Sequence, residues 1–121
     1  MESKPMQANY VGMPNLPGWT ITGTHSVLLD QFEQTLTILE IYERNLDSLM
    51  QEFTAVEDET KAQEVVYASQ DVRAAFSQLA ALAATFCQKS KDKELKKEVS
   101  ESREAKQKSH TELQMKAARI Q

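Results

Sequence analysis

The chain has 121 residues, 40% of them hydrophobic and 26% charged, and a formal net charge of -4, a composition that indicates one globular domain rather than a disordered chain. A basic start followed by an apolar run is lacking at the N-terminus, the longest apolar stretch is too short to span a bilayer, and the single cysteine cannot form an intrachain disulfide. We therefore expect a cytoplasmic or nuclear protein.

The first 23 residues differ from the rest, because they contain all three glycines and all three prolines of the chain. These residue types break helices, so the sequence predicts an irregular arm over 1–23 and a helical domain over 24–121. Within the arm, Tyr10, Leu16 and Trp19 are candidate docking side chains, and Pro14 and Pro17 favour an extended backbone. Two alternatives stay open: the arm packs on its own bundle, or it docks in a groove of a partner.

The first helix is predicted near 24–55, with the Thr24 hydroxyl as its N-terminal cap. Apolar residues recur at alternating steps of four and three, which places them on one stripe of the helix. This stripe, as likely to serve as ordinary bundle core as an interface, contains Leu28, Phe32, Leu39, Tyr42, Leu46, Leu49 and Phe53. Leu29, Leu36 and Met50 widen it, so we expect more than one neighbouring helix.

A turn is predicted at 56–59, followed by a second helix near 60–88 that starts with a capping box from Thr60 to Gln63. The stripe of this helix contains Val65, Val72, Phe76, Leu79 and Phe86. Alanines flank the stripe, and small side chains allow close approach of a neighbouring helix.

The third helix is predicted near 92–120. Its apolar track, which contains Leu95, Val99, Leu113 and Ile120, is out of phase with the second helix. Either the chain breaks near 90–92 and folds back, or one long helix presents two faces; Ser90 and Asp92 are suitable caps and favour the break. The predicted fold class is therefore all-α: an elongated antiparallel helical hairpin or three-helix bundle with coiled-coil heptads, preceded by the irregular arm.

Sequence signatures of catalysis or of cofactor and metal binding are lacking. His25 and His110 have no metal-binding spacing, Cys87 has the character of a small buried thiol, and no glycine-rich phosphate loop occurs. We expect no enzyme activity, no cofactor and no metal.

The C-terminal quarter is basic, with 10 Lys or Arg against 6 Asp or Glu after residue 87, whereas residues 1–87 contain 4 against 12. A candidate basic patch consists of Lys89, Lys91, Lys93, Lys96 and Lys97. Acidic residues interrupt it and no aromatic residue is interleaved, so a solvated helix face is favoured over nucleic-acid binding.

The leading functional prediction is a non-catalytic adaptor or structural subunit that assembles with other helical chains, in a homo- or hetero-oligomer. On that view, Leu39→Asp and Leu46→Asp would break the assembly. The alternatives are a binder of nucleic acid or an anionic surface through the basic C-terminal helix, and a self-contained three-helix regulator or chaperone that captures a partner peptide.

Overall fold

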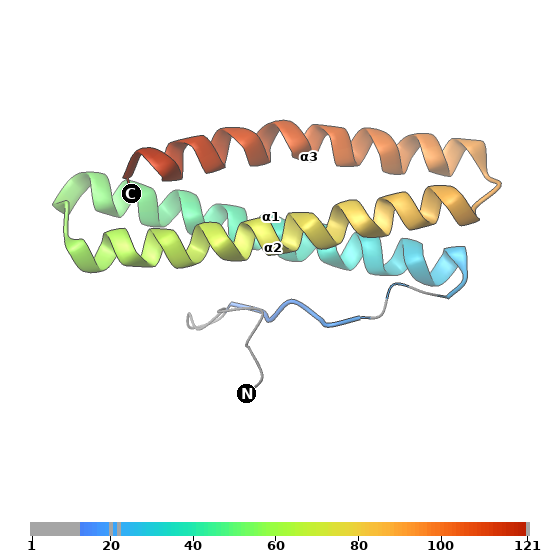
Figure 1. Cartoon of the computed structure of the whole chain (residues 1–121), viewed down its shortest axis with the longest axis horizontal. Helices are drawn as coiled ribbons and strands as arrows, with labels where there is room; N and C mark the ends of the chain where they lie inside the picture. Colours follow the sequence, from blue (N-terminus) through green and yellow to red (C-terminus); the bar gives the residue numbers. More distant parts are fainter. Residues whose placement is uncertain (1–12, 20, 22, 121) are drawn as a thin grey trace.

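The computed structural model describes residues 13–19, 21 and 23–120, and it contains three long helices in this part of the chain. These are α1 (His25–Val56), α2 (Glu59–Lys89) and α3 (Lys93–Ile120). The chain runs along α1, returns along α2 and runs along α3 in the direction of α1 (Figure 1). The predicted all-α bundle is confirmed, and each helix end lies within one residue of its predicted position.

The start of α1 differs from the prediction in one detail. Thr24 occupies the N-cap position with an extended backbone, but its hydroxyl lies 3.3 Å from the Ser26 Oγ and makes no capping bond to a described backbone N–H. At the other end, Glu57 adopts a left-handed conformation with a φ of 50°, and its N–H donates to the Phe53 carbonyl. This is the usual way to close the last turn of a helix, although glycine is the residue that fits it best.

The predicted capping box at the start of α2 is wrong. The N-cap is Asp58, and Thr60 already lies inside the first turn, so its hydroxyl is not in position to cap. No side-chain cap bond is formed at this N-terminus within the described residues. The sequence Asp58-Glu59-Thr60 offers two capping residues within three positions, and the chain uses the earlier one as the boundary.

The predicted break between α2 and α3 is confirmed, and both expected capping residues form it. The Ser90 Oγ accepts a hydrogen bond from the Asp92 N–H at 3.1 Å. The Asp92 Oδ1 accepts from the N–H groups of Glu94 and Leu95, each at 3.1 Å, which satisfies two free donors of the first turn of α3. The chain therefore folds back instead of continuing as one helix.

The predicted stripe of α1 lies inside the bundle, where six of its seven members are buried and Phe53, near the end of the helix, is half-buried. Leu39 and Leu46 are fully buried. An aspartate at either position would place a charge in the core and unfold the chain. These two substitutions are therefore unsuitable as tests of an interface, and an interface must use other residues.

The middle helix, α2, uses two faces. Phe86 contacts α1 through an edge-to-face arrangement with His25, with ring centroids 6.5 Å apart, and Val65, Val72 and Leu79 precede it on the same row at seven-residue steps. Phe76 instead stacks on His110 of α3. The predicted α2 stripe, which is buried throughout, thus combines residues that serve two different neighbours.

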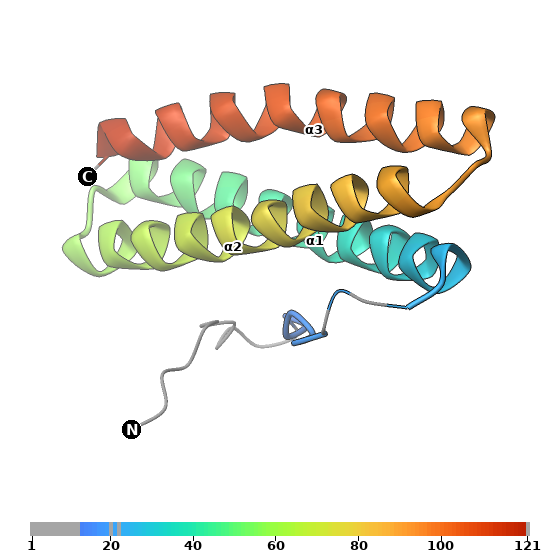
Figure 2. The same ribbon diagram turned by 45° about the vertical axis from the view of Figure 1, so that its right-hand side comes forward.

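The arm lies on the opposite side of the α1–α2 hairpin from α3, as both ribbon views show (Figures 1 and 2). Leu16 and Trp19 are partly buried against the core. The Tyr42 hydroxyl donates to the Pro14 carbonyl at 2.6 Å, which fastens the arm to the middle of α1. Tyr10, the third predicted docking side chain, lies outside the described residues.

Candidate functional site

The main surface feature is an open groove between α1 and α3. It arises because α3 packs mainly against α2 and meets α1 at few positions. The groove has three consecutive sections, with volumes of about 190, 540 and 400 Å³ from the start of α3 to its end. We call this feature the α1–α3 groove.

The floor of the α1–α3 groove consists of two rows of side chains with seven-residue spacing. The α1 row contains Leu29, Leu36, Glu43 and Met50, and the α3 row contains Val99, Lys106, Leu113 and Ile120. Apart from one charged residue in each row, the floor is apolar. Met50 and Val99 are buried, whereas the four other apolar side chains are half-buried at the edge of the core. These half-buried side chains leave apolar surface facing the groove.

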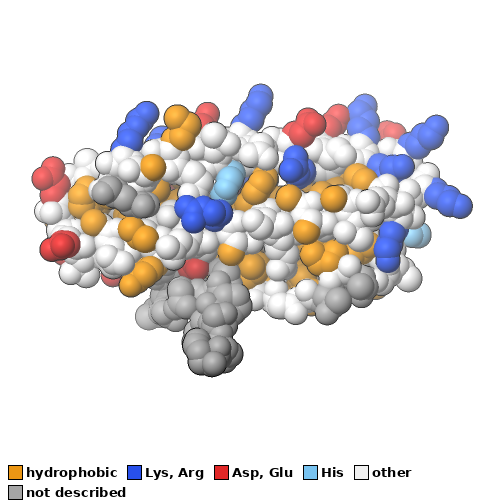
Figure 3. All heavy atoms as spheres, viewed as in Figure 1, with side chains coloured by type: hydrophobic (Ala, Val, Ile, Leu, Met, Phe, Trp, Pro, Cys, Tyr) orange, Lys and Arg blue, Asp and Glu red, His pale blue; other side chains and the backbone are white. Residues whose placement is uncertain are grey.

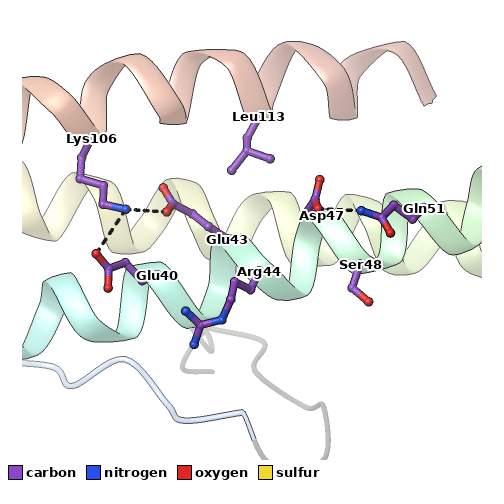
Figure 4. Close-up of a pocket in the computed structure, with 8 residues that line it drawn as sticks. All are labelled: Glu40, Glu43, Arg44, Asp47, Ser48, Gln51, Lys106 and Leu113. Atoms are coloured by element: carbon purple, nitrogen blue, oxygen red, sulfur yellow. Dashed lines mark hydrogen bonds and ion pairs between the residues drawn. The ribbon is translucent and has the colours of Figure 1, made fainter.

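The two charged floor residues pair with each other across the groove. The Lys106 Nζ lies 2.8 Å from the Glu43 Oε1 and 3.6 Å from the Glu40 Oε2 (Figure 4). Glu43 is only 9% exposed, and its Oε2 has no hydrogen-bond partner among the described residues. The pair therefore interrupts two apolar rows at the same level and leaves one buried acceptor unsatisfied.

The α1 rim of the groove is acidic. Glu33, Glu40 and Asp47 line the groove and follow one another at seven-residue steps, which place them on nearly one line of the helix. The nearby Arg44 extends away from α3 (Figure 4). The α3 rim is mixed, with Glu98 in the first section and Lys116 and Arg119 in the last.

The contact between α2 and α3 is largely polar and aromatic. The rings of Phe76 and His110 stack with centroids 4.4 Å apart, and the Arg103 guanidinium lies 5.9 Å from the Phe76 centroid. Burial, and secondarily the charge of Arg73, lowers the pKa of His110. The Gln114 amide donates to the Ser69 carbonyl at 3.0 Å. These contacts explain how α3 docks with Val99 and Ala117 as its only fully buried side chains within the described residues.

Cys87 lies half-buried under the start of α3. Its sulfur is 3.9 Å from the Lys96 carbonyl oxygen and 3.6 Å from the Ser100 Oγ. Access to the thiol therefore depends on how firmly α3 is docked.

Tyr42 connects the core with the arm. Burial, and secondarily the charge of Asp71, raises the pKa of Tyr42 to about 12. The neutral hydroxyl is therefore the form that the fold favours, in keeping with its donated bond to Pro14.

The predicted basic patch surrounds the turn between α2 and α3. Lys89, Lys91, Lys93 and Lys97 are exposed and Lys96 is half-buried. The Lys89 Nζ donates to the Gly23 carbonyl at 2.9 Å. In Figure 3, basic side chains along α3 and at this end of the bundle alternate with acidic ones, so no uninterrupted basic surface forms on this face.

Two further searches of the described residues bear on function. No three histidine, cysteine, aspartate or glutamate side chains are grouped as a metal site within them. Nor does any helix of this part of the chain combine the length and apolar character needed to cross a membrane.

Sequence reasoning identified most of the apolar floor but missed its central ion pair. Leu29, Leu36 and Met50 were expected to widen the α1 stripe, and Val99, Leu113 and Ile120 were expected to form the α3 track. A signal for the pair was present, because Glu43 lies seven residues from Leu36 and from Met50, and Lys106 lies seven residues from Val99 and from Leu113. Opposite charges at the same step of two apolar rows indicate a buried pair.

Comparison with protein-family models, curated proteins and solved structures gives no match for this chain. The functional inference therefore depends on the groove and its charges.

Proposed function

We propose that this protein is a non-catalytic helical adaptor or structural subunit, and that it accepts a helix of another protein chain in the α1–α3 groove. The observation that supports this proposal is the pair of apolar rows on the groove floor, which have no helix packed over them within the described residues. A helix laid along both rows would complete a four-helix arrangement, in which each helix contacts two neighbours.

The length of the groove suits a helix. Leu29 and Met50 are 21 residues apart on α1, which at 1.5 Å per residue corresponds to about 32 Å. Apolar side chains at steps of three, four and seven on a partner helix would fit between the two rows. At the level of Glu43 and Lys106, the partner needs a small or polar side chain, because an apolar one would cover the ion pair without satisfying it.

The groove is a better acceptor than the faces of the α1–α2 hairpin. One face of the hairpin is covered by α3 and the opposite face by the arm (Figures 1 and 2). A peptide captured there, as the regulator alternative requires, would have to displace one of them. The α1–α3 groove needs no displacement.

Photocrosslinking in the cells that produce the protein tests this proposal. A photoreactive amino acid is placed at Ser102 or Gln51, which line the groove, and in control chains at Gln70 or Ser77, which are exposed on α2. We expect both groove positions, and neither control, to crosslink to the same second chain. Purified together, the two chains should then form a complex of defined mass in light scattering.

A variant pair adds a quantitative check. Leu36→Glu places a charge on the groove floor, and Tyr67→Glu places the same charge on an exposed apolar residue of α2. We expect at least tenfold weaker binding of the crosslinked partner to Leu36→Glu and unchanged binding to Tyr67→Glu, with both variants checked for helix content. Equal affinity of both variants for the partner would refute docking in the groove.

A further inference from the structure

We infer that the helix accepted by the α1–α3 groove is basic along the flank that faces α1, with Lys or Arg at seven-residue spacing. This inference rests on the proposed function and specifies the chemistry of the partner. It is based on the acidic row of Glu33, Glu40 and Asp47 on the α1 rim.

The acidic row has the spacing that a flanking helix can match. Seven residues are nearly two helical turns, so successive carboxylates are about 10.5 Å apart along α1 and drift by only about 20° per step. A packed helix that repeats a cation every seven residues keeps the same register. Three pairs can then form along one edge, in the manner of the charged flanks of coiled coils.

Within the bundle, the acidic row is poorly neutralised. Glu33 has no ion-pair partner among the described residues, and Glu40 reaches only the shared Lys106 at 3.6 Å. Asp47 accepts a hydrogen bond from the neutral Gln51 amide at 2.9 Å. The row therefore keeps a negative potential that favours a cationic partner.

A second observation points the same way. Glu43 lies beside this row in the middle section, is nine-tenths buried, and has one carboxylate oxygen without a hydrogen-bond partner among the described residues. Its carboxylate points toward Lys106 and the middle of the groove (Figure 4). A Lys or Arg donor from the partner at the level of Glu40 would add a cation where this carboxylate is incompletely satisfied.

The same analysis makes a second copy of this chain a poor occupant. If α1 of a second copy entered the groove, two acidic rows would face each other and repel. In α3, the basic residues that repeat at seven-residue spacing are Lys96 and Arg103. Both are half-buried, and Arg103 already lies over Phe76. The charges of this chain therefore favour a different chain as the partner.

Binding of synthetic helices to the full chain tests the inference. Three peptides as long as α3, 28 residues, share one apolar stripe and carry Lys, Gln or Glu at seven-residue spacing on one flank. Their affinities are measured by fluorescence anisotropy at low and high salt. We expect the Lys peptide to bind about tenfold more tightly than the Gln peptide and the Glu peptide to bind most weakly, with differences that shrink as salt rises.

Two chain variants assign the preference to the row. The groove variant combines Glu33→Gln, Glu40→Gln and Asp47→Asn. The control variant removes the same charge from exposed positions of α3 with Glu101→Gln, Glu104→Gln and Glu112→Gln. We expect the groove variant to lose the preference for the Lys peptide and the control variant to keep it.

The failures of the two proposals are distinguishable. Equal binding of all three peptides to the wild-type chain would overturn the basic partner and leave the groove as a helix acceptor. Binding of none would overturn both. A wild-type chain that forms a dimer in light scattering, and whose dimer excludes the peptides, would make a second copy the occupant and overturn the inference.

Discussion

Replacing Lys106 by methionine should destabilise the bundle by about 2 kcal/mol. The substitution keeps the aliphatic stem of the side chain but leaves the Glu43 carboxylate without the cation that lies 2.8 Å away. Removal of one partner from a fully buried ion pair costs about 3–5 kcal/mol. The cost is smaller here because the Lys106 and Glu43 side chains remain 18% and 11% exposed.

The reverse single substitution should cost less. In Glu43→Leu, Lys106 keeps Glu40 as a partner and its flexible stem can carry the ammonium group to water, so we expect a loss of at most about 1 kcal/mol. The double variant Glu43→Leu/Lys106→Met should be at least as stable as the wild type, because both floor rows become continuously apolar.

Urea unfolding of the four proteins, followed by circular dichroism, measures these differences. For a domain of this size, a loss of 2 kcal/mol corresponds to a fall in Tm of about 6–10 °C. An unchanged Lys106→Met variant would show that Glu43 does not depend on this cation. A double variant as unstable as Lys106→Met alone would show that the pair is a net stabilising contact, which contradicts our reasoning.

Three further predictions concern single residues. The raised pKa of Tyr42, about 12 against an ordinary 10.0, contributes stability that is fully present below pH 10 and lost as the pH rises to 12. Tyr42→Phe, which also loses the bond to Pro14, should therefore be about 1 kcal/mol less stable than wild type at neutral pH and lose less above pH 10 in urea unfolding. The lowered pKa of His110 contributes stability that is present above pH 6.5 and lost on acidification, so alkylation of Cys87 should become faster at pH 5.5 in wild type than in His110→Phe measured at the same pH. Glu57→Gly should stabilise the chain by about 0.5–1 kcal/mol in thermal melts, because glycine tolerates the φ of 50°; unchanged values in any of these assays would contradict the corresponding contact.

The helices and their ends could be predicted from the sequence because helix formation depends on nearby residues. The absence of glycine and proline after residue 23 defined the helical region, and Ser90 and Asp92 marked the break. Where two capping residues competed, at Asp58 and Thr60, the sequence did not decide between them. The coiled-coil character of the stripes stays a prediction.

Assignment of each apolar row to a neighbour was beyond the sequence. Steps of three and four generate two overlapping stripes on α2, so Phe86 on one row faces α1 and Phe76 on the other faces α3. Both belong to one continuous pattern in the sequence. The identity of the facing helix depends on how the three helices pack, which is not local information.

The docking of α3 was also difficult to predict, because it depends on residues that sequence analysis treats as polar surface. His110 supplies a stacked ring, and Gln114 donates to the Ser69 carbonyl. A hydropathy pattern counts both as outward-facing positions. The sequence therefore predicted a weakly docked helix correctly in apolar content, but it could not show the specific contacts that hold it.

The half-buried floor of the α1–α3 groove links partner binding to the stability of α3. On its α2 side this helix has few buried apolar side chains, and on its groove side Leu113 and Ile120 are only half-buried. A helix in the groove would bury the exposed part of both, so it binds the docked form of α3 more tightly than an undocked one. By linkage, a bound partner must then stabilise α3 by the same free energy that docking of α3 contributes to binding. Protection of the α3 amides from hydrogen exchange should therefore rise when a groove-binding helix is added, and the alkylation rate of Cys87, which lies under α3, should fall with it.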